Sequence, residues 1–279
     1  MKITKKIIAL VAVVAMLAGL CLINAEAKSV NYLLLGDSIA FGQGIRNSSE
    51  ACYGRIVADT NGYAYMNDAV SGSSSKALLK LLDDDLVAAD IRNADIIQLS
   101  IGGNDFLTKN WLGMGLLGRI TGNYSSFDSI AEGFEENIGK IISNIRSKNS
   151  HAVIIFQTVY NPNNGRWQDT FEEGVSRLNG AIRGYLKKHP GAYRIADVGS
   201  VISGHDEYIA ADTIHPNAAG NIAIARYMLG YLKNAGLGSR TTPVINTQPI
   251  DNTGWGISYW FDNFFYALRL VDRITGLFS

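Results

Sequence analysis

The sequence is poor in cysteine, with two cysteines in 279 residues, Cys21 and Cys52. Cys21 lies in an N-terminal segment that we expect to be removed, so the mature chain would hold Cys52 alone. An intrachain disulfide is therefore excluded, although the chain is expected to be exported. The fold must depend on its hydrophobic core, and a chain of this length can bury a large one.

An excess of charge is also missing, because 25 basic and 25 acidic residues give a formal net charge of +0. Loss of the N-terminal segment would remove three lysines and Glu26, leaving 22 basic and 24 acidic residues and a charge of −2. No block of basic residues stands out, which argues against a nucleic acid as the partner. The substrate need not be strongly charged either.

Signals for a metal or a nucleotide cofactor are lacking as well. The runs Asp83-Asp84-Asp85 and Glu135-Glu136 fall in helical patterns, where solvated helix faces are the better interpretation than a metal site or a glycosidase pair. Gly42-Gln43-Gly44 lacks the lysine and the hydroxyl residue of a phosphate-binding loop. We therefore expect no metal and no cofactor.

An apolar run, Ile7 to Leu20, lies near the N-terminus. Three lysines precede it and Ala25-Glu26-Ala27 follows it, a pattern typical of a signal peptide over residues 1–27 with cleavage after Ala27. The sequence thus predicts a secreted or extracytoplasmic protein. A retained membrane anchor is less favoured because the run is short for a span. Attachment of lipid at Cys21 is disfavoured by the bulky Leu20 before it.

After this segment, strand-like and helix-like stretches alternate, which predicts an α/β fold with a parallel sheet covered by helices. The expected strands are Val30–Leu35, Tyr63–Val70, Asp95–Ile101, Ala152–Thr158 and Tyr193–Val198. The expected helices are Ser48–Thr60, Ser74–Ala89, Phe127–Lys148, Trp167–Lys188 and Pro216–Ala235. The sequence shows no internal repeat, and we expect one domain over residues 28–238.

Two segments depart from this alternation. Phe106–Tyr124 is a glycine-separated apolar insertion, interpreted either as a lid or acyl-binding wall or as an ordinary surface loop. Residues 239–256 have the composition of a polar linker. Residues 257–279 show the spacing of an amphipathic aromatic helix, which we expect either to fold back on the domain or to contact a membrane surface or a partner.

Candidate catalytic residues stand at expected strand ends. The first strand runs into Gly36-Asp37-Ser38, and a serine at the carboxyl end of a parallel strand can be held rigid and exposed. Asp212 and His215 stand three residues apart before the last helix. At that spacing the carboxylate can orient the imidazole, whose other nitrogen is left to accept a serine proton. His205 is the main competing base.

Acyl transfer also needs donors for the developing oxyanion, and two further strand ends offer them. Gly72 follows the second expected strand and permits close approach of a backbone N–H. Asn104 follows Gly102-Gly103 at the end of the third and could contribute its side-chain amide. Alone, each is equally well explained as a turn or cap residue, so their shared order and strand context carry the hypothesis.

Together, Gly36-Asp37-Ser38, Gly72, Gly103-Asn104-Asp105 and Asp212-x-x-His215 resemble the four signature blocks of the SGNH/GDSL hydrolase family. The resemblance spans Gly36 to His215 and leaves out the chain beyond Ser239. It implies a flavodoxin-like three-layer α/β/α sandwich with a five-stranded parallel sheet, and esterase chemistry without a metal. It implies Ser38 as nucleophile, His215 as base and Asp212 as orienting acid, with oxyanion donors from Ser38, Gly72 and Asn104.

The expected activity is hydrolysis of acetyl or short acyl esters, on small-molecule, carbohydrate or cell-wall substrates, through an acyl-enzyme. A lipase or lysophospholipase at a membrane surface is the alternative. A non-catalytic binding module is a third interpretation, disfavoured by the complete set of site residues.

Overall fold

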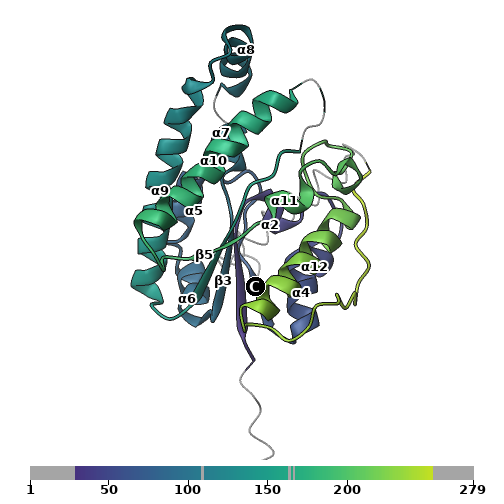
Figure 1. Ribbon diagram of the computed structural model, residues 1–279. Helices are drawn as coiled ribbons and strands as arrows, with labels where there is room; N and C mark the ends of the chain where they lie inside the picture. Colours follow the sequence, from purple (N-terminus) through teal and green to yellow (C-terminus); the bar gives the residue numbers. More distant parts are fainter. Residues whose placement is uncertain (1–28, 108–109, 163–164, 166, 254–279) are drawn as a thin grey trace, which may run out of the picture.

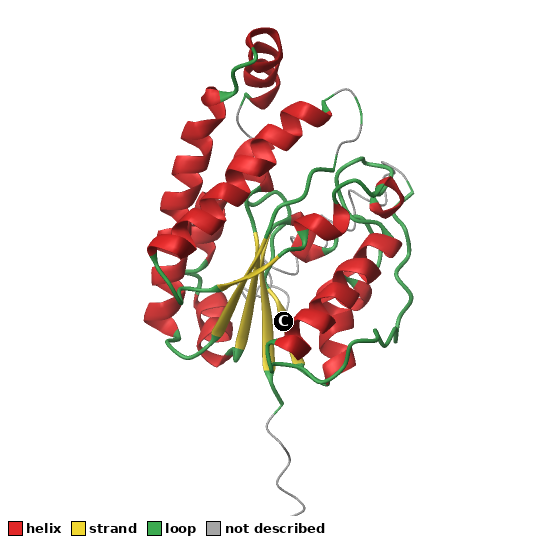
Figure 2. Ribbon diagram, in the orientation of Figure 1, coloured by secondary structure: helices red, strands yellow, loops and turns green. Residues whose placement is uncertain are grey.

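A computed structural model describes residues 29–107, 110–162, 165 and 167–253 of the chain. Its centre is a five-stranded parallel sheet of β1 (Asn31–Gly36), β2 (Ala64–Asn67), β3 (Ile96–Ser100), β4 (Val153–Gln157) and β5 (Arg194–Ala196). Helices cover both faces of the sheet (Figures 1 and 2). The predicted three-layer α/β/α architecture is confirmed.

Side chains that alternate between the two faces of the sheet divide the hydrophobic core into two halves. Leu33 and Leu35 of β1 pack with α5 (Ser75–Leu81), α6 (Asp85–Asn93), α9 (Asp128–Lys148) and α10 (Gln168–Lys188). Tyr32 and Leu34 point to the opposite face and pack with α4 (Tyr53–Asn61), α11 (Gly199–Ile202) and α12 (Ala218–Asn234). Successive side chains of a strand point to opposite faces, so one apolar run supplies both halves.

The strand order is β2-β1-β3-β4-β5, the flavodoxin-like order that the family resemblance implies. From β1 the chain moves outward to β2 and then crosses back to β3 on the other side. Ligands in such sheets bind beyond the carboxyl ends of the strands at this reversal. The fold therefore directs attention to the loops that follow β1 and β3.

Capping and turn residues shorten or divide several of the expected helices. The expected helix Ser48–Thr60 is α3 (Ser48–Ala51) and α4, separated by Cys52 with an extended backbone. The helix expected over Ser74–Ala89 is α5 and α6, and α6 begins after Asp84, whose carboxylate accepts from Leu86 and Val87 N–H. The last helix begins at Ala218, after its N-cap Asn217, rather than at Pro216.

The apolar insertion expected over Phe106–Tyr124 is largely helical. It contains the end of α7 (Gly103–Leu107) and the whole of α8 (Trp111–Thr121). The described residues also form the short helix α2 (Ser38–Phe41) and the 3-10 helices η1 (Ser125–Phe127) and η2 (Asp206–Tyr208). The glycines of this insertion do not interrupt helix α8. Gly115 and Gly118 lie where α8 packs closely against Thr170 and Tyr124, and a larger side chain would clash there.

The described part of the expected polar linker, residues 239–253, runs across the surface of the domain. Val244 N–H donates to Thr60 Oγ1, Arg46 N–H donates to the Ile250 carbonyl, and Ala218 N–H donates to Asp251 Oδ1. This segment thus joins α4, the loop before α3 and the start of α12. The predicted signal peptide and C-terminal helix lie outside the described residues. Among the residues described, none of the helices combines the length and apolar character needed to cross a membrane.

Candidate active site

Ser38 is held at the exit of β1 by a glycine and an aspartate. Gly36 has φ 147°, and a Cβ there would lie 2.0 Å from the Ser100 carbonyl oxygen, so only glycine fits where β1 and β3 converge. Asp37 N–H donates to the same oxygen at 3.0 Å. The Asp37 carboxylate accepts from Ile39 N–H and caps α2 (Ser38–Phe41), which begins at Ser38. The serine is thereby fixed at a helix N-terminus.

His215 and Asp212 lie in one hydrogen-bonded row with Ser38. His215 Nε2 is 2.8 Å from Ser38 Oγ, and His215 Nδ1 is 2.7 Å from Asp212 Oδ2. These three side chains come from opposite ends of the chain, 177 residues apart between Ser38 and His215. The row can move a proton from the serine hydroxyl to the imidazole.

A tight turn brings Asp212 back to His215. Thr213 has φ 64°, and Asp212 Oδ1 accepts from both Ile214 and His215 N–H at 3.0 Å. Tyr160, in the loop that follows β4, donates its hydroxyl to the Ile214 carbonyl at 2.7 Å. The backbone next to His215 is thus held by the loop after β4 as well as by Asp212.

The environment of Asp212 keeps its carboxyl group ionised. Burial opposes the charged form, but the hydrogen bonds from the His215 ring and from the two backbone N–H groups outweigh it and lower the pKa below its usual value. A carboxylate in this state stabilises an imidazolium on His215 as it forms.

The two further candidate oxyanion donors line the same cleft as Ser38. This cleft encloses about 510 Å³, and both Gly72 and Asn104 contribute to its wall beside Ser38 and His215. Gly72 adopts φ 81° in its turn, and Asn104 Nδ2 donates one hydrogen to the Ser73 carbonyl at 3.0 Å. The structure therefore brings together all five residues that the sequence proposed.

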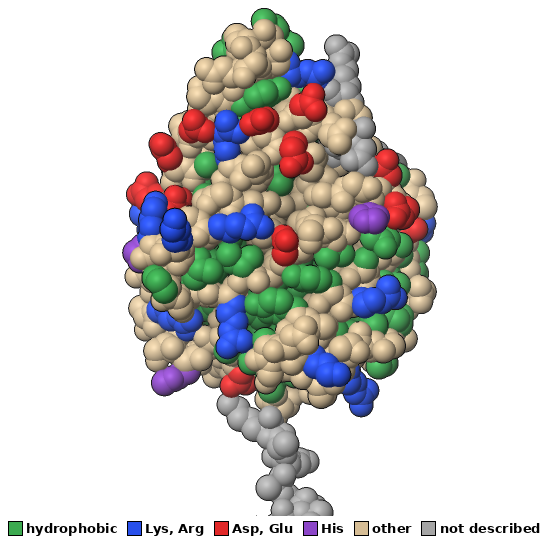
Figure 3. Space-filling view, in the orientation of Figure 1, with side chains coloured by type: hydrophobic (Ala, Val, Ile, Leu, Met, Phe, Trp, Pro, Cys, Tyr) green, Lys and Arg blue, Asp and Glu red, His purple; other side chains and the backbone are tan. Residues whose placement is uncertain are grey.

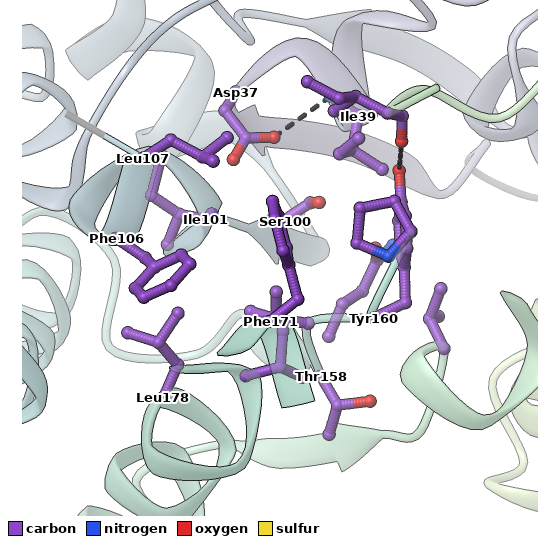
Figure 4. Close-up of a pocket in the computed structure, with 17 residues that line it drawn as sticks. Asp37, Ile39, Ser100, Ile101, Phe106, Leu107, Thr158, Tyr160, Phe171 and Leu178 are labelled. Carbon is purple, nitrogen blue, oxygen red and sulfur yellow. Dashed lines mark hydrogen bonds between the residues drawn. The ribbon is translucent and has the colours of Figure 1, made fainter. Parts of the chain in front are cut away.

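A second cavity of about 620 Å³ adjoins the cleft and shares five lining residues with it, Asp37, Ile39, Gly103, Leu107 and Ile214. Its walls are mostly apolar. Figure 4 shows Phe106, Leu107 and Leu178 on one side and Tyr160 on the other. Sequence reasoning missed Tyr160 and the α10 side chains Phe171, Val175 and Leu178. Their helical periodicity marked them as buried, but it does not show that they face a cavity.

Asp37 is the buried acid of this region. Burial raises the pKa of its carboxyl group to about 7, the hydrogen bond from Ile39 N–H lowers it in part, and the nearby charge of Asp105 raises it further. Its side chain forms part of the wall between the cleft and the apolar cavity. The region thus combines an ionised Asp212 with an Asp37 that holds its proton up to neutral pH.

Other candidate groups lie elsewhere. His205 Nδ1 pairs with Glu207 at 2.8 Å in an exposed loop. Asp83 pairs with Lys148 and Glu136 with Lys140 on the surface. Within the described part of the chain, no cluster of three or more His, Cys, Asp or Glu side chains could hold a metal ion.

The sheet order β2-β1-β3-β4-β5 places the chain among the α/β proteins whose ligands bind beyond the carboxyl ends of the strands, where Ser38, His215 and Asp212 meet. A family model described as "GDSL-like Lipase/Acylhydrolase family" matches residues 34–223. The chain belongs to this family and is a carboxylic ester hydrolase. The uncharacterized protein YpmR of Bacillus subtilis (strain 168) is 31% identical over 183 residues, 61% of this chain and 67% of its own length.

Solved structures share the fold at low sequence identity. The lipase Lip_vut3 from a goat rumen metagenome is 21% identical with a TM-score of 0.57, and the match covers 75% of this chain and 99% of that one. Phospholipase A1 from Streptomyces albidoflavus NA297 is 19% identical with a TM-score of 0.53, covering 76% of this chain and 100% of that one. The fold of this chain therefore matches nearly the whole of both of these structures.

Proposed function

We propose that the protein is an exported serine esterase that works through a covalent acyl-enzyme. The 2.8 Å contact between Ser38 Oγ and His215 Nε2 carries this proposal. Ser38 Oγ attacks the ester carbonyl carbon while its proton passes to His215 Nε2, and Asp212 stabilises the imidazolium. His215 then protonates the leaving alcohol. A water molecule, deprotonated by the same nitrogen, releases the acid.

The charge that develops on the carbonyl oxygen needs donors in place before reaction. The backbone N–H groups of Ser38 and Gly72 and the amide of Asn104 are the groups we assign to it, because all three residues line one cleft. Removal of one such donor costs about 10²–10³ in kcat in serine hydrolases.

The nucleophile assignment is tested with Ser38→Ala. We expect hydrolysis of p-nitrophenyl butyrate to fall by at least about 10⁴-fold, because the proposed acyl-enzyme bond is formed by Ser38 Oγ. Labelling by a fluorophosphonate probe should disappear, and the circular dichroism spectrum and melting temperature should stay close to those of the parent. Retention of labelling in this variant would refute Ser38 as nucleophile.

The apolar cavity favours acyl groups longer than acetyl. Its wall includes Phe171, Val175 and Leu178 of α10, more apolar surface than an acetyl methyl can cover. Each further methylene buried there contributes about 0.8 kcal/mol. This observation supports the lipase or lysophospholipase interpretation over deacetylation of carbohydrate. With p-nitrophenyl esters, kcat/KM should rise by about threefold or more per methylene from acetate toward octanoate.

Val175→Phe provides the matched variant, because Val175 lines the cavity but not the cleft around Ser38. It should remove most of the gain with chain length and leave acetate hydrolysis near the parental rate. A parental profile confined to acetate would instead support the carbohydrate esterase.

Export is the remaining part of the proposal, supported by the lysines, apolar run and Ala25-Glu26-Ala27 of the N-terminal segment. N-terminal sequencing of protein recovered outside the cytoplasm should begin at Lys28. An N-terminus at Met1 or Lys2 in that fraction would contradict cleavage.

A further inference from the structure

Helix α8 exposes its large apolar side chains. Leu112, Leu116, Leu117 and Ile120 are 51%, 52%, 56% and 74% exposed, whereas the apolar stripes of α9 and α10 are buried. At 100° per residue these four side chains occupy one continuous face of the helix. Among the described residues, α8 thus turns outward the face that a helix of a water-soluble enzyme normally buries.

The inner face of α8 holds two glycines, Gly115 and Gly118, beside Met114, which packs against the core. A Cβ at Gly115 would lie 2.3 Å from Thr170 Cγ2, and one at Gly118 would lie 2.4 Å from Tyr124 Cδ1. These glycines let α8 pack closely against α10 and the turn before η1. Rotation of α8 to bury its leucines would break that fit, so the outward orientation of the apolar face is built into the packing.

We propose that this face of α8, which we call the α8 surface and define as Leu112, Leu116, Leu117 and Ile120, docks on a lipid surface. Its side chains are all aliphatic and offer no hydrogen bond that would specify a protein partner. Residues 111–121 contain no carboxylate and one cation, Arg119, which lies over the ring of Trp167 at 5.3 Å. Contact with lipid therefore desolvates no acidic group of the helix.

The shape of the molecule fits an extended surface better than a groove. α8 lies beyond the ends of α9 and α10, at the upper end of the molecule in Figure 1, and apolar atoms are visible there in Figure 3. A convex end of this kind can touch a planar lipid phase before the rest of the domain does. A groove on a partner protein is not needed to cover it.

The position of the α8 surface connects it to the active site. α8 follows α7 closely in the chain, and Phe106 and Leu107 of α7 line the apolar cavity beside Ser38. Docking would place the cleft near a phase in which long-chain esters are concentrated. This consequence rests on the proposed function, and it assigns esters held in membranes or lipid aggregates as the substrate class.

A fluorescent label placed on α8 tests the docking without catalysis. In the full chain carrying Ser38→Ala and Cys21→Ser, a polarity-sensitive dye is attached through Leu117→Cys, since the natural Cys52 is fully buried. On addition of phosphatidylcholine vesicles we expect the emission to shift to shorter wavelength and to be quenched by lipid-borne nitroxides. The same dye at Ile250→Cys, which is 51% exposed on another part of the surface, should keep its emission in water.

An unchanged emission from the dye on α8 in the presence of vesicles would overturn the proposal, even if the protein binds vesicles through another segment. A shift that depends on protein concentration without vesicles would overturn it in favour of a second copy of the chain. The dye could also be shielded from aqueous quenchers before vesicles are added and become accessible once residues 254–279 are removed by proteolysis. That result would overturn the proposal, because this segment would then cover the α8 surface.

Kinetics separate this proposal from the esterase assignment. The double variant Leu116→Gln/Leu117→Gln should keep kcat/KM for monomeric p-nitrophenyl butyrate within about twofold, while hydrolysis of vesicle-bound ester falls by about tenfold or more. Ile250→Gln should change neither rate. Equal rates on vesicles for the double variant and the parent would refute the docking surface and leave the esterase assignment intact. Absence of activity on both substrates in the parent would refute the esterase assignment itself.

Discussion

At the scale of single residues, the candidate site keeps a strained backbone at Thr213. A β-branched residue at φ 64° costs of order 1–3 kcal/mol. The turn that it permits lets Asp212 accept from two backbone N–H groups and from the His215 ring at once. These hydrogen bonds compensate for the strain and hold the Asp212 carboxylate against the His215 ring.

Asp37 should make the stability of the protein depend on pH. Well below about pH 4 its carboxyl group is protonated in both the folded and the unfolded chain. Between there and its folded pKa of about 7, only the unfolded chain releases the proton, so this residue makes stability fall as pH rises. The slope is at most about 1.4 kcal/mol per pH unit.

Asp37→Asn keeps an oxygen that can accept from Ile39 N–H but does not titrate. We expect its free energy of unfolding, relative to the parent, to increase from pH 4 to pH 7 and to level off above. Urea unfolding at pH 4, 5, 6, 7 and 8 measures this difference. A difference that is the same at every pH would show that Asp37 ionises normally in the folded state.

The residues around the nucleophile were predictable because each has a local signal. Glycines and polar side chains at the ends of apolar runs mark strand exits, and parallel strands end at one edge. The raised pKa of Asp37 and the cavity beside it were not predictable. The pKa depends on burial of the carboxyl group and on the charge of Asp105, and the cavity depends on side chains of α7 and α10. These neighbours are far from Asp37 in the sequence, so the local pattern around Asp37 does not reveal them.

At the scale of elements, the segment 239–253 acts as a surface strap rather than as a spacer. Asn47 is central to it, because its amide donates to the Gln248 carbonyl and its oxygen accepts from Ile250 N–H. Asn47→Ala should lower the free energy of unfolding by about 1–2 kcal/mol and speed proteolysis within the strap. Gln248→Ala retains the backbone carbonyl and should have little effect. If both variants unfolded with the parental free energy, the two Asn47 hydrogen bonds would contribute nothing to stability.

The differences between expected and observed elements share a cause. The helical spacing of apolar residues predicted α9 and α10 to within one residue at each end, because a long helix repeats this spacing many times. It joined α3 to α4 and α5 to α6, because the breaks at Cys52 and Asp84 leave the apolar spacing almost unchanged. For α8 the apolar spacing did not indicate which face packs on the protein, because Gly115 and Gly118 pack inward beside Met114 while the leucines are exposed. Small residues that pack closely carry no hydrophobic signal.

At the scale of the whole molecule, the sheet joins two cores that do not touch across it. Adjacent residues of β4 show this division, because Ile154 belongs to the core under α9 and α10 and Ile155 to the core under α4 and α12. The number of strands and their parallel arrangement followed from the residues. The strand order could not be predicted from the residues, because an apolar run does not indicate which strands lie beside it. That order was implied by the family resemblance.

Because every strand contributes to both cores, we expect them to unfold together. Ile154→Ala and Ile155→Ala should each lower the free energy of unfolding by about 2–5 kcal/mol, and both should shift one transition. Far-ultraviolet circular dichroism, near-ultraviolet circular dichroism and esterase activity, followed through the same urea titration, should give coincident midpoints in each variant. If activity and near-ultraviolet signal were lost before the helices in Ile155→Ala alone, the α4 and α12 side would be an independent unit, and the sheet would not transmit stability between its two faces.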